Sequence, residues 1–306
     1  MAKYVIKRIL SAIPLMLVIV LVIFFMMQVI PGNPISVMMG EKASPAVIER
    51  VTEEMGLNDP MIVRFTNYVR DALHGDFGRS YKLNREVSDL IWEAFPNTVI
   101  LAVTASLVAW IIGIPAGIVS AVKKDSLLDR GLMGFSLTGI SLPVFWVAML
   151  VQWVFGYQLG WFPISGYTTP LHKVLPALVL GWSSAGSIAR MTRSNLLETL
   201  RNDFVRTARA KGLSGKGVIW KHALKNAMMP VVTMMAIQFA SMLSGAILTE
   251  SVFGIGGIGQ LAVSAINTRD MPLLAGTTLF STIITILGNM AADILYCFID
   301  PRIREA

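Results

Sequence analysis

Four long runs without a charged residue constrain the fold of this chain more than any other feature of its sequence. The runs are 22 to 26 residues long and cover 9–30, 97–122, 226–249 and 271–292. A charged side chain near the centre of a bilayer costs roughly 2.5–3.5 kcal/mol, so uncharged runs of about 20 residues predict transmembrane helices. With 54% hydrophobic and 15% charged residues, the chain is also more apolar than an ordinary soluble domain.

Two further spans are predicted between the second and third of these runs. The segment 131–172 contains no Asp, Glu, Lys or Arg, and it is too long for one span. It is interrupted by Pro163, Gly166 and Pro170. The shorter apolar run that follows predicts either a helix buried among others or one that extends into the next polar segment. We therefore expect an all-α polytopic membrane protein with one transmembrane domain, 1–306, whose six spans are about 9–30, 97–122, 132–155, 174–192, 226–249 and 271–299.

The distribution of basic residues predicts the orientation of these spans. Seventeen Lys and Arg lie on one side and nine on the other, and seven of those nine share the long loop 31–96 with ten acids. Because basic residues concentrate on the cytoplasmic side, both termini and the loop 193–225 are predicted there, with 31–96 outside. The first run is longer than the apolar part of a signal peptide, and no A-x-A-like site follows it, so we interpret it as a retained span.

Two glycine patterns resemble nucleotide-binding motifs but lack the required context. The sequence "GIGGIG" at 254–259 follows a predicted span rather than a strand, and "GLSGKG" at 212–217 lacks the first glycine and the final Ser/Thr of a phosphate loop. A single cysteine, Cys297, and three dispersed histidines supply no catalytic or metal-binding motif; these are His74, His172 and His222. We therefore expect no enzyme activity, cofactor or metal site in this chain.

The basic loop between the fourth and fifth predicted spans has an unusual order of residues. In "TARAKGL", the small residues Ala208, Ala210 and Gly212 alternate with basic ones. This order suits a short helix that another protein approaches closely, with Gly212 at its C-terminal end. Membrane topology and attraction to anionic lipid account for the net charge of +7 without nucleic acid as a partner.

The chain resembles the inner-membrane permease subunits of binding-protein-dependent ABC importers, in particular those of the peptide and nickel type. In that family the loop before the penultimate span carries an E-A-A signature with a glycine four residues later. Here Arg206, Thr207 and Ala208 occupy the E-A-A places, and Gly212 is the glycine. The other matching pieces, in chain order, are "PGNP", "GDFGRS", "SLPVFW", "MTRSNLLETLRNDFVRTARAKGL", "LKNAMMPVVT", "GAILTESVFG", "NTRDMP" and "DPRIR".

This resemblance implies a type I importer fold and a set of partners. These are a second homologous permease, two cytoplasmic ATPase subunits that use ATP and Mg²⁺, and an external solute-binding protein. The loop would form a coupling helix that docks on an ATPase, with Ala208, Arg209 and Gly212 as the expected contacts. The full candidate segment is Arg206, Thr207, Ala208, Arg209, Ala210, Lys211 and Gly212.

Four polar residues within the predicted spans are candidates for the translocation path. They are Asp293, Asn289, Gln238 and Gln152. Lipid cannot satisfy such groups, so they either line a cavity or form hydrogen bonds between helices. The Gly113-x-x-x-Gly117 pattern and the prolines in the spans indicate either helices that pivot or ordinary close packing.

The substrate stays open at this stage. Di- and oligopeptides are the first expectation, with nickel, metal chelates and glutathione as alternatives. Asn33, Ile255, Gly256 and Met271 depart from the family's usual residues in external or near-external segments. A channel or secondary transporter without ATPases is the competing class. By resemblance, the location is the cytoplasmic membrane of a bacterium or archaeon.

Overall fold

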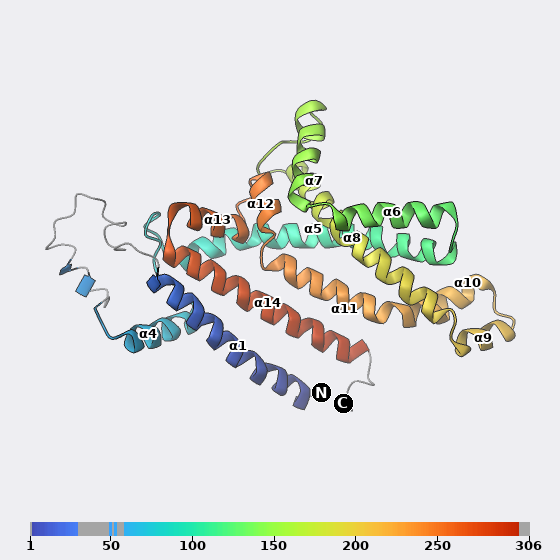
Figure 1. The fold of residues 1–306 in the computed structure, drawn as a ribbon, viewed down its shortest axis with the longest axis horizontal. Coiled ribbons are helices and arrows are strands. Elements are labelled where there is room, and N and C mark those ends of the chain that lie inside the picture. The colour runs from blue at the N-terminus through green and yellow to red at the C-terminus, as the bar shows by residue number, and fades with distance from the viewer. Residues whose placement is uncertain (1, 30–48, 51, 54–57, 300–306) are drawn as a thin grey trace.

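The computed structural model describes residues 2–29, 49–50, 52–53 and 58–299. Within them, regular structure is helical apart from one isolated bridge between Arg79 and Glu86. In Figure 1, α1, α14 and α11 lie side by side, with α5, α8 and α6 beyond them. The elements are α1 (Ala2–Val29), α4 (Met61–Leu73), α5 (Val87–Val122), α6 (Leu127–Ser141), α7 (Val144–Val151), the π-helix η1 (Gln152–Gln158), α8 (Pro170–Thr199), α9 (Asp203–Ala210), α10 (Gly215–Gly217), the π-helix η2 (Val218–Ala223), α11 (Leu224–Leu243), α12 (Ile247–Phe253), α13 (Ile258–Thr268) and α14 (Met271–Ile299).

Length and composition of these helices agree with a protein that crosses the membrane several times. Four described stretches are long and apolar enough to span a bilayer, namely Leu10–Met27, Val87–Val122, Gly215–Leu243 and Met271–Ile294. The bent pairs α6 with α7–η1, and α12 with α13, raise this number to six if each pair is one span. The prediction of an all-α polytopic membrane protein is confirmed. Helix ends are not membrane boundaries, so the expected span limits remain predictions.

The fourth expected span lies in α8, which is not among those six stretches and is enclosed by several other helices instead. It contacts α5, α6 and α11, and Leu175, Ile188 and Leu196 on it are almost fully buried. It also continues to Thr199, seven residues beyond the expected limit. Burial and extension, which the sequence offered as alternatives, therefore both occur. Protein neighbours rather than lipid surround much of α8, so its modest hydropathy is tolerated.

The third expected span differs from the structure because its helix is broken. α6 ends at Ser141, and α7 starts at Val144 at an angle of 104°. Leu142 and Pro143 both adopt extended ψ values, of 137° and 126°. Proline disfavours helical geometry in the residue before it, so Pro143 ends α6 and begins a new helix in another direction.

Two other helices begin or end away from the expected limits. α5 starts at Val87, ten residues before the uncharged run, because the polar turn that precedes it continues directly into the helix. The helix that holds the fifth span ends at Leu243, and Gly245 follows with φ +115°, a left-handed conformation that suits glycine. α12 and α13 then form a second bend of 81°.

Small residues set the distance between α5 and α8. A β-carbon at Gly117 would lie 2.5 Å from the carbonyl oxygen of Ala189, and one at Gly113 would lie 2.8 Å from that of Ala185. From the other side, a β-carbon at Gly181 would lie 2.7 Å from the carbonyl oxygen of Ala105. The Gly113-x-x-x-Gly117 pattern therefore marks a helix contact in which the two backbones touch.

We expect Gly117→Ala to destabilise the chain by about 1–3 kcal/mol, because the added methyl group must push α8 away. Gly134→Ala is the matched control, since a β-carbon at Gly134 on α6 meets no atom within 4 Å. Thermal unfolding of the purified variants in mild detergent measures the difference. Equal stability of the two variants would show that α5 and α8 do not need this close approach.

Candidate functional site

The segment predicted to couple this chain to a partner folds as α9, a short amphipathic helix at one end of the bundle. Val205 is fully buried and Ala208 is 5% exposed, whereas the remaining residues of α9 are exposed. The two buried side chains pack on a cluster that is supplied by α5, α8, η2 and α11, and consists of Ala121, Leu196, Val218, Ala223 and Ala227. α9 is therefore seated on the ends of three long helical stretches.

The structure changes the role expected for Ala208. It faces the chain's own helices, so it does not offer a contact surface in the way that the sequence suggested. Its small side chain instead allows α9 to lie close to η2. Arg206, Thr207, Arg209, Ala210 and Lys211 form the exposed face that remains for a partner.

Gly212 ends α9 as the sequence predicted. It follows the C-cap residue Lys211 and has φ +79°, and its N–H donates to the carbonyl of Arg209 (3.0 Å). Left-handed glycine after the last helical turn is the usual way to end a helix. A β-carbon here would meet no atom of the chain within 4 Å. The space beside Gly212 is consequently open.

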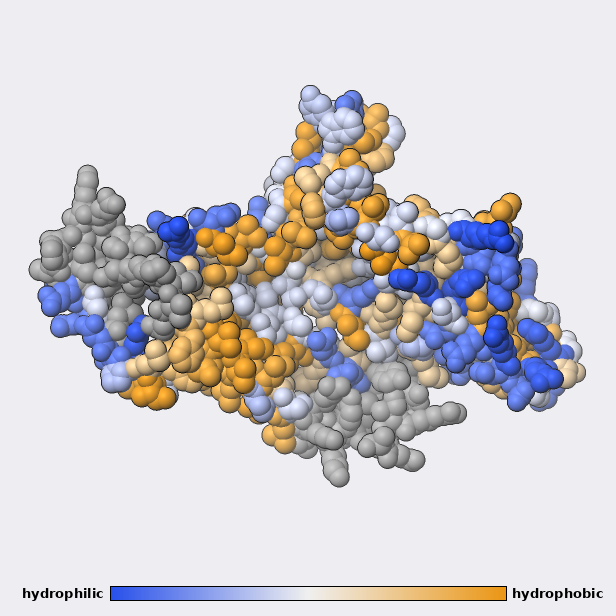
Figure 2. All heavy atoms as spheres, viewed as in Figure 1, coloured by the Kyte–Doolittle hydropathy of each residue, from blue (hydrophilic) through white to orange (hydrophobic). Residues whose placement is uncertain are grey.

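Large apolar side chains are exposed around these basic residues. Phe204 on α9 is 41% exposed, Leu213 is 42% exposed, and Trp220 on η2 is 61% exposed. Figure 2 shows that this end of the molecule carries a concentration of hydrophilic residues with apolar ones among them. Arginine and aromatic residues are enriched where proteins meet. Exposed arginine and aromatic side chains both occur on this surface.

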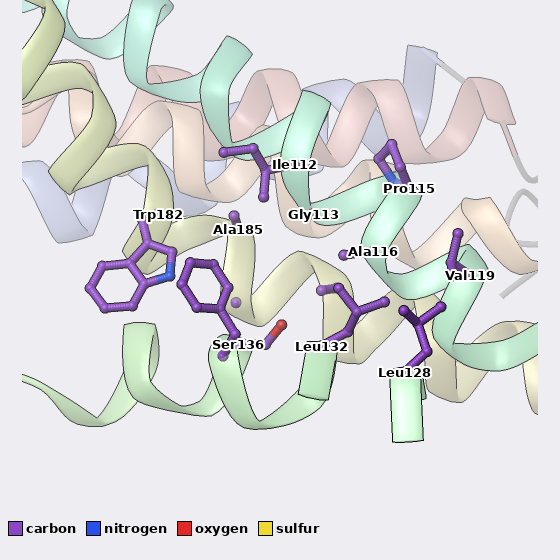
Figure 3. Close-up of a pocket in the computed structure, with 13 residues that line it drawn as sticks. Ile112, Gly113, Pro115, Ala116, Val119, Leu128, Leu132, Ser136, Trp182 and Ala185 are labelled. Carbon is purple, nitrogen blue, oxygen red and sulfur yellow. The ribbon is translucent and has the colours of Figure 1, made fainter. Parts of the chain in front are cut away.

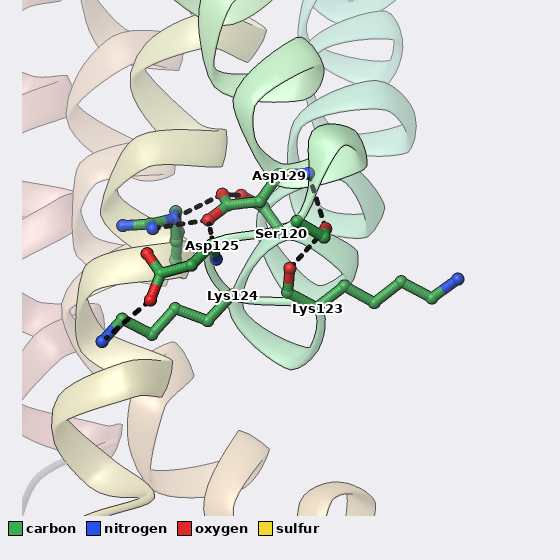
Figure 4. Close-up of polar contacts among 7 residues, drawn as sticks. Ser120, Lys123, Lys124, Asp125 and Asp129 are labelled. Atoms are coloured by element: carbon green, nitrogen blue, oxygen red, sulfur yellow. Dashed lines mark hydrogen bonds and ion pairs between the residues drawn. The ribbon is translucent and has the colours of Figure 1, made fainter.

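A buried ion pair braces the same end (Figure 4). Asp129 on α6 accepts two hydrogen bonds from Arg193 on α8, from Nε and from one terminal nitrogen, both at 2.8 Å. It also accepts from the hydroxyl of Ser120 on α5 and from the backbone N–H of Asp125 (2.9 Å). Asp129 is only 3% exposed. Its carboxylate thus fixes the α5–α6 turn against α8, next to the residues on which α9 packs.

The four candidates for the translocation path occupy different environments. Gln152 donates from Nε2 to the carbonyls of Ile164 (2.5 Å) and Val252 (3.2 Å), so it joins η1 to the next loop and to α12. Gln238 keeps a buried Oε1 without a hydrogen-bond partner in the described part of the chain. Asn289 is exposed on α14, and Asp293 lies half-buried one turn later. Gln152 therefore has a visible structural role, and lining of a path stays a prediction for the other three.

Sequence reasoning missed a buried acid at the bend between α12 and α13. Glu250 has no exposed surface; its carboxylate accepts from Thr98 (2.9 Å) and from the backbone N–H of Gln260 (3.0 Å). Thr98 also accepts from the N–H of Ile258 (2.9 Å), in the first turn of α13. Glu250 and Thr98 thus satisfy amide groups at the start of α13 that have no partner within the helix.

The "GIGGIG" pattern makes room for this arrangement. A β-carbon at Gly257 would lie 2.5 Å from the carboxylate of Glu250, and one at Gly259 would lie 2.9 Å from it. Glycine is needed at these positions because of the buried side chain and not because of a nucleotide. The only signal in the sequence was an acid a few residues before a glycine-rich stretch, and many unrelated loops share it.

A third buried acid, Asp270, joins the turn 78–86 to the start of α14. It accepts from Ser80 Oγ (2.5 Å) and from the backbone N–H groups of Lys82 (3.1 Å) and Leu273 (3.3 Å). Burial, with a smaller contribution from the charge of Asp270, raises the pKa of Tyr81 above its ordinary value. The motifs "GDFGRS" and "NTRDMP" are therefore in contact.

Comparison with known proteins places these features in a family. The binding-protein-dependent transport system inner membrane component family matches residues 113–305, and the N-terminal family of the same transport systems matches residues 1–102. The dipeptide transport system permease protein DppB of Alkalihalophilus pseudofirmus is 40% identical and covers 99% of this chain and 100% of its own. The glutathione transport system permease protein GsiC of Escherichia coli K12 is also 40% identical, with 99% of both chains covered.

Solved structures show the same fold. The inward-facing MetNI methionine ABC transporter matches with a TM-score of 0.59 at 19% identity, over 69% of this chain and 96% of the matched chain. An amino acid ABC transporter matches with a TM-score of 0.56 at 13% identity, over 68% and 94%. The predicted importer permease fold is confirmed. The chain belongs to the family of inner membrane components of binding-protein-dependent transport systems, and is a permease subunit rather than an ATPase.

Proposed function

We propose that this chain forms half of the translocation pathway of an ATP-driven importer for peptides, and that α9 is its contact with a cytoplasmic ATPase subunit. The observation that supports this proposal best is the division of α9 into a buried face and an exposed face. Val205 and Ala208 fix it to the ends of α5, α8 and η2, whereas the basic residues face outward beside exposed Phe204. A partner that displaces such a helix would also displace the helices on which it packs.

The mechanism requires no catalytic group in this chain. ATP and Mg²⁺ would act in the partner ATPases, whose closing and opening would displace α9. Because Asp129 and Arg193 tie α6 to α8, and glycines hold α8 against α5, these helices would move as one rigid unit. Rotation of that unit relative to a second permease would open the pathway to one side of the membrane and then to the other.

Peptides are the substrate class that the relatives support. Two relatives with 40% identity over nearly the whole chain carry dipeptide and glutathione transport in their names, and glutathione is itself a tripeptide. Nickel or metal chelates, the alternative from the sequence, have no comparable support among these relatives. An external binding protein would deliver the peptide and set much of the specificity.

The proposed orientation places α9 in the cytoplasm. The side that holds α9 carries 17 of the 26 Lys and Arg residues, which indicates the cytoplasmic side. The start of α1 and the end of α14 lie toward the same end of the bundle as α9 (Figure 1). Both termini would therefore be cytoplasmic, in the inner membrane of the cell.

Reversal of charge on the exposed face of α9 tests the docking proposal. The double variant Arg206→Glu/Arg209→Glu should insert normally but lose at least about tenfold in peptide uptake, because two charge-assisted contacts to the ATPase are removed. Co-purification of the ATPase subunits with the tagged chain should fall in parallel. Arg70→Glu, on exposed α4 far from α9, is the control and should retain both properties. Wild-type uptake by the double variant at normal protein level would refute the assignment.

Two substitutions of Gly212 distinguish the effect of a large side chain from the effect of backbone strain. Gly212→Trp should abolish coupling, since its side chain fills the open space beside α9, yet leave membrane insertion intact. Gly212→Asn is the control, because asparagine tolerates a left-handed conformation better than other non-glycine residues and is much smaller. Uptake and ATP hydrolysis are measured together. Normal uptake by the tryptophan variant would show that no partner approaches this position closely.

Loss of the cation that faces Asp129 should lower the stability of the helices on which α9 packs. Arg193→Met leaves a buried carboxylate without its ion pair, at a cost of about 3 kcal/mol. The double variant Asp129→Asn/Arg193→Met should recover much of this loss, because no uncompensated charge stays buried. Thermal unfolding in detergent is the measurement. A single variant as stable as the double one would show that the pair contributes little.

A further inference from the structure

An apolar groove opens on the outside of the bundle between α5 and α6, with α8 as its floor (Figure 3). Its volume is about 380 Å³. Ile112 and Val119 form the α5 wall and Leu128 the α6 wall. These three side chains are 37–46% exposed, whereas Ala185 and Ala189 on the floor are buried. Trp182 closes the end of the groove that lies away from Val119. The exposed walls belong to helices apolar enough to lie in a membrane.

The size of the groove restricts what can fill it. From Trp182 to Ala189 the floor runs along two turns of α8, a length of about 10 Å. A single flexible hydrocarbon chain fits.

Two basic residues follow closely, along α5 and α8, on residues that line one end of the groove. Lys123 follows Val119 by one turn, and its backbone N–H donates to the carbonyl of Val119 (2.9 Å). Arg190, which is exposed, directly follows the floor residue Ala189. The nearby acids form ion pairs with other residues. Asp129 binds Arg193, and the Oδ2 atom of Asp125 lies 3.6 Å from Nζ of Lys124. Among the described residues, no ion pair is recorded for Lys123 or Arg190.

We propose that this groove binds an acyl chain of an anionic phospholipid, whose head group is held at Lys123. The hydrocarbon would lie between α5 and α6 and reach Trp182, and the phosphate would meet the lysine at the end of α5. Basic residues at the ends of grooves between membrane helices attract anionic head groups, and the apolar walls retain the chain. The lipid would fill the space between α5 and α6 beside the Asp129–Arg193 ion pair.

Quenching of Trp182 fluorescence by brominated lipid tests the site. The full-length chain, purified with its partner subunits, is placed in phosphatidylcholine vesicles that contain a minor fraction of brominated phosphatidylglycerol or, in parallel, brominated phosphatidylcholine. The difference between wild type and Trp182→Phe isolates the signal of this tryptophan. We expect about a fivefold preference for the anionic lipid, the factor that one basic residue supplies near a charged head group.

Matched variants distinguish lipid binding in this groove from contact with the surrounding bilayer. Lys123→Gln should reduce the preference to about onefold, and Ala116→Phe, which fills the groove, should remove quenching of Trp182. Val103→Phe on the exposed surface of α5 outside the groove should change neither. Equal quenching by the two lipids, unchanged quenching in Ala116→Phe, or a Trp182 that no lipid reaches because another chain covers it would each overturn the proposal.

Discussion

The close contact between α5 and α8 is the constraint on which the rest of the structure depends. Helices in lipid gain little from the hydrophobic effect when they associate, so tight packing of backbones must hold them together. Gly113 and Gly117 on α5, with Gly181 on α8, permit this approach. α8 then presents its far end, near Leu196, as part of the seat for α9. The position of the proposed coupling helix therefore follows from contacts made deep within the bundle.

Three buried acids hold the places where the helices bend or turn. Asp129 secures the α5–α6 turn, Glu250 the bend between α12 and α13, and Asp270 the turn before α5. Each carboxylate accepts from backbone N–H groups in a turn or at the start of a helix, where these groups have no helical partner. Irregular backbone is stable at such depth only where protein supplies the missing hydrogen bonds. These acids make the bends rigid, which a mechanism based on moving helix units requires.

The sequence predicted much of the candidate site but not its two faces. The small and basic residues of α9 and the terminal glycine were visible in "TARAKGL", and Gly212 has the expected left-handed conformation. That Ala208 points into the chain could not be read from the sequence, because it depends on the partners that α5, α8 and η2 bring to it. The same is true of Glu250, whose glycine-rich neighbourhood has meaning only once Gly257 and Gly259 are folded against its carboxylate.

The sequence by itself determined that the chain is an apolar, multi-helix membrane protein, because uncharged runs near 20 residues have few other stable forms. The break at Pro143 also has a local cause, since proline acts on its immediate neighbours, although one continuous span was expected over 132–155. Only the tertiary structure decided that α8, the least apolar of the expected spans, is the enclosed helix, and that Asp129 meets Arg193 across 64 positions of the chain. Local sequence sets helices and breaks, whereas burial and charge pairing depend on which distant segments come together.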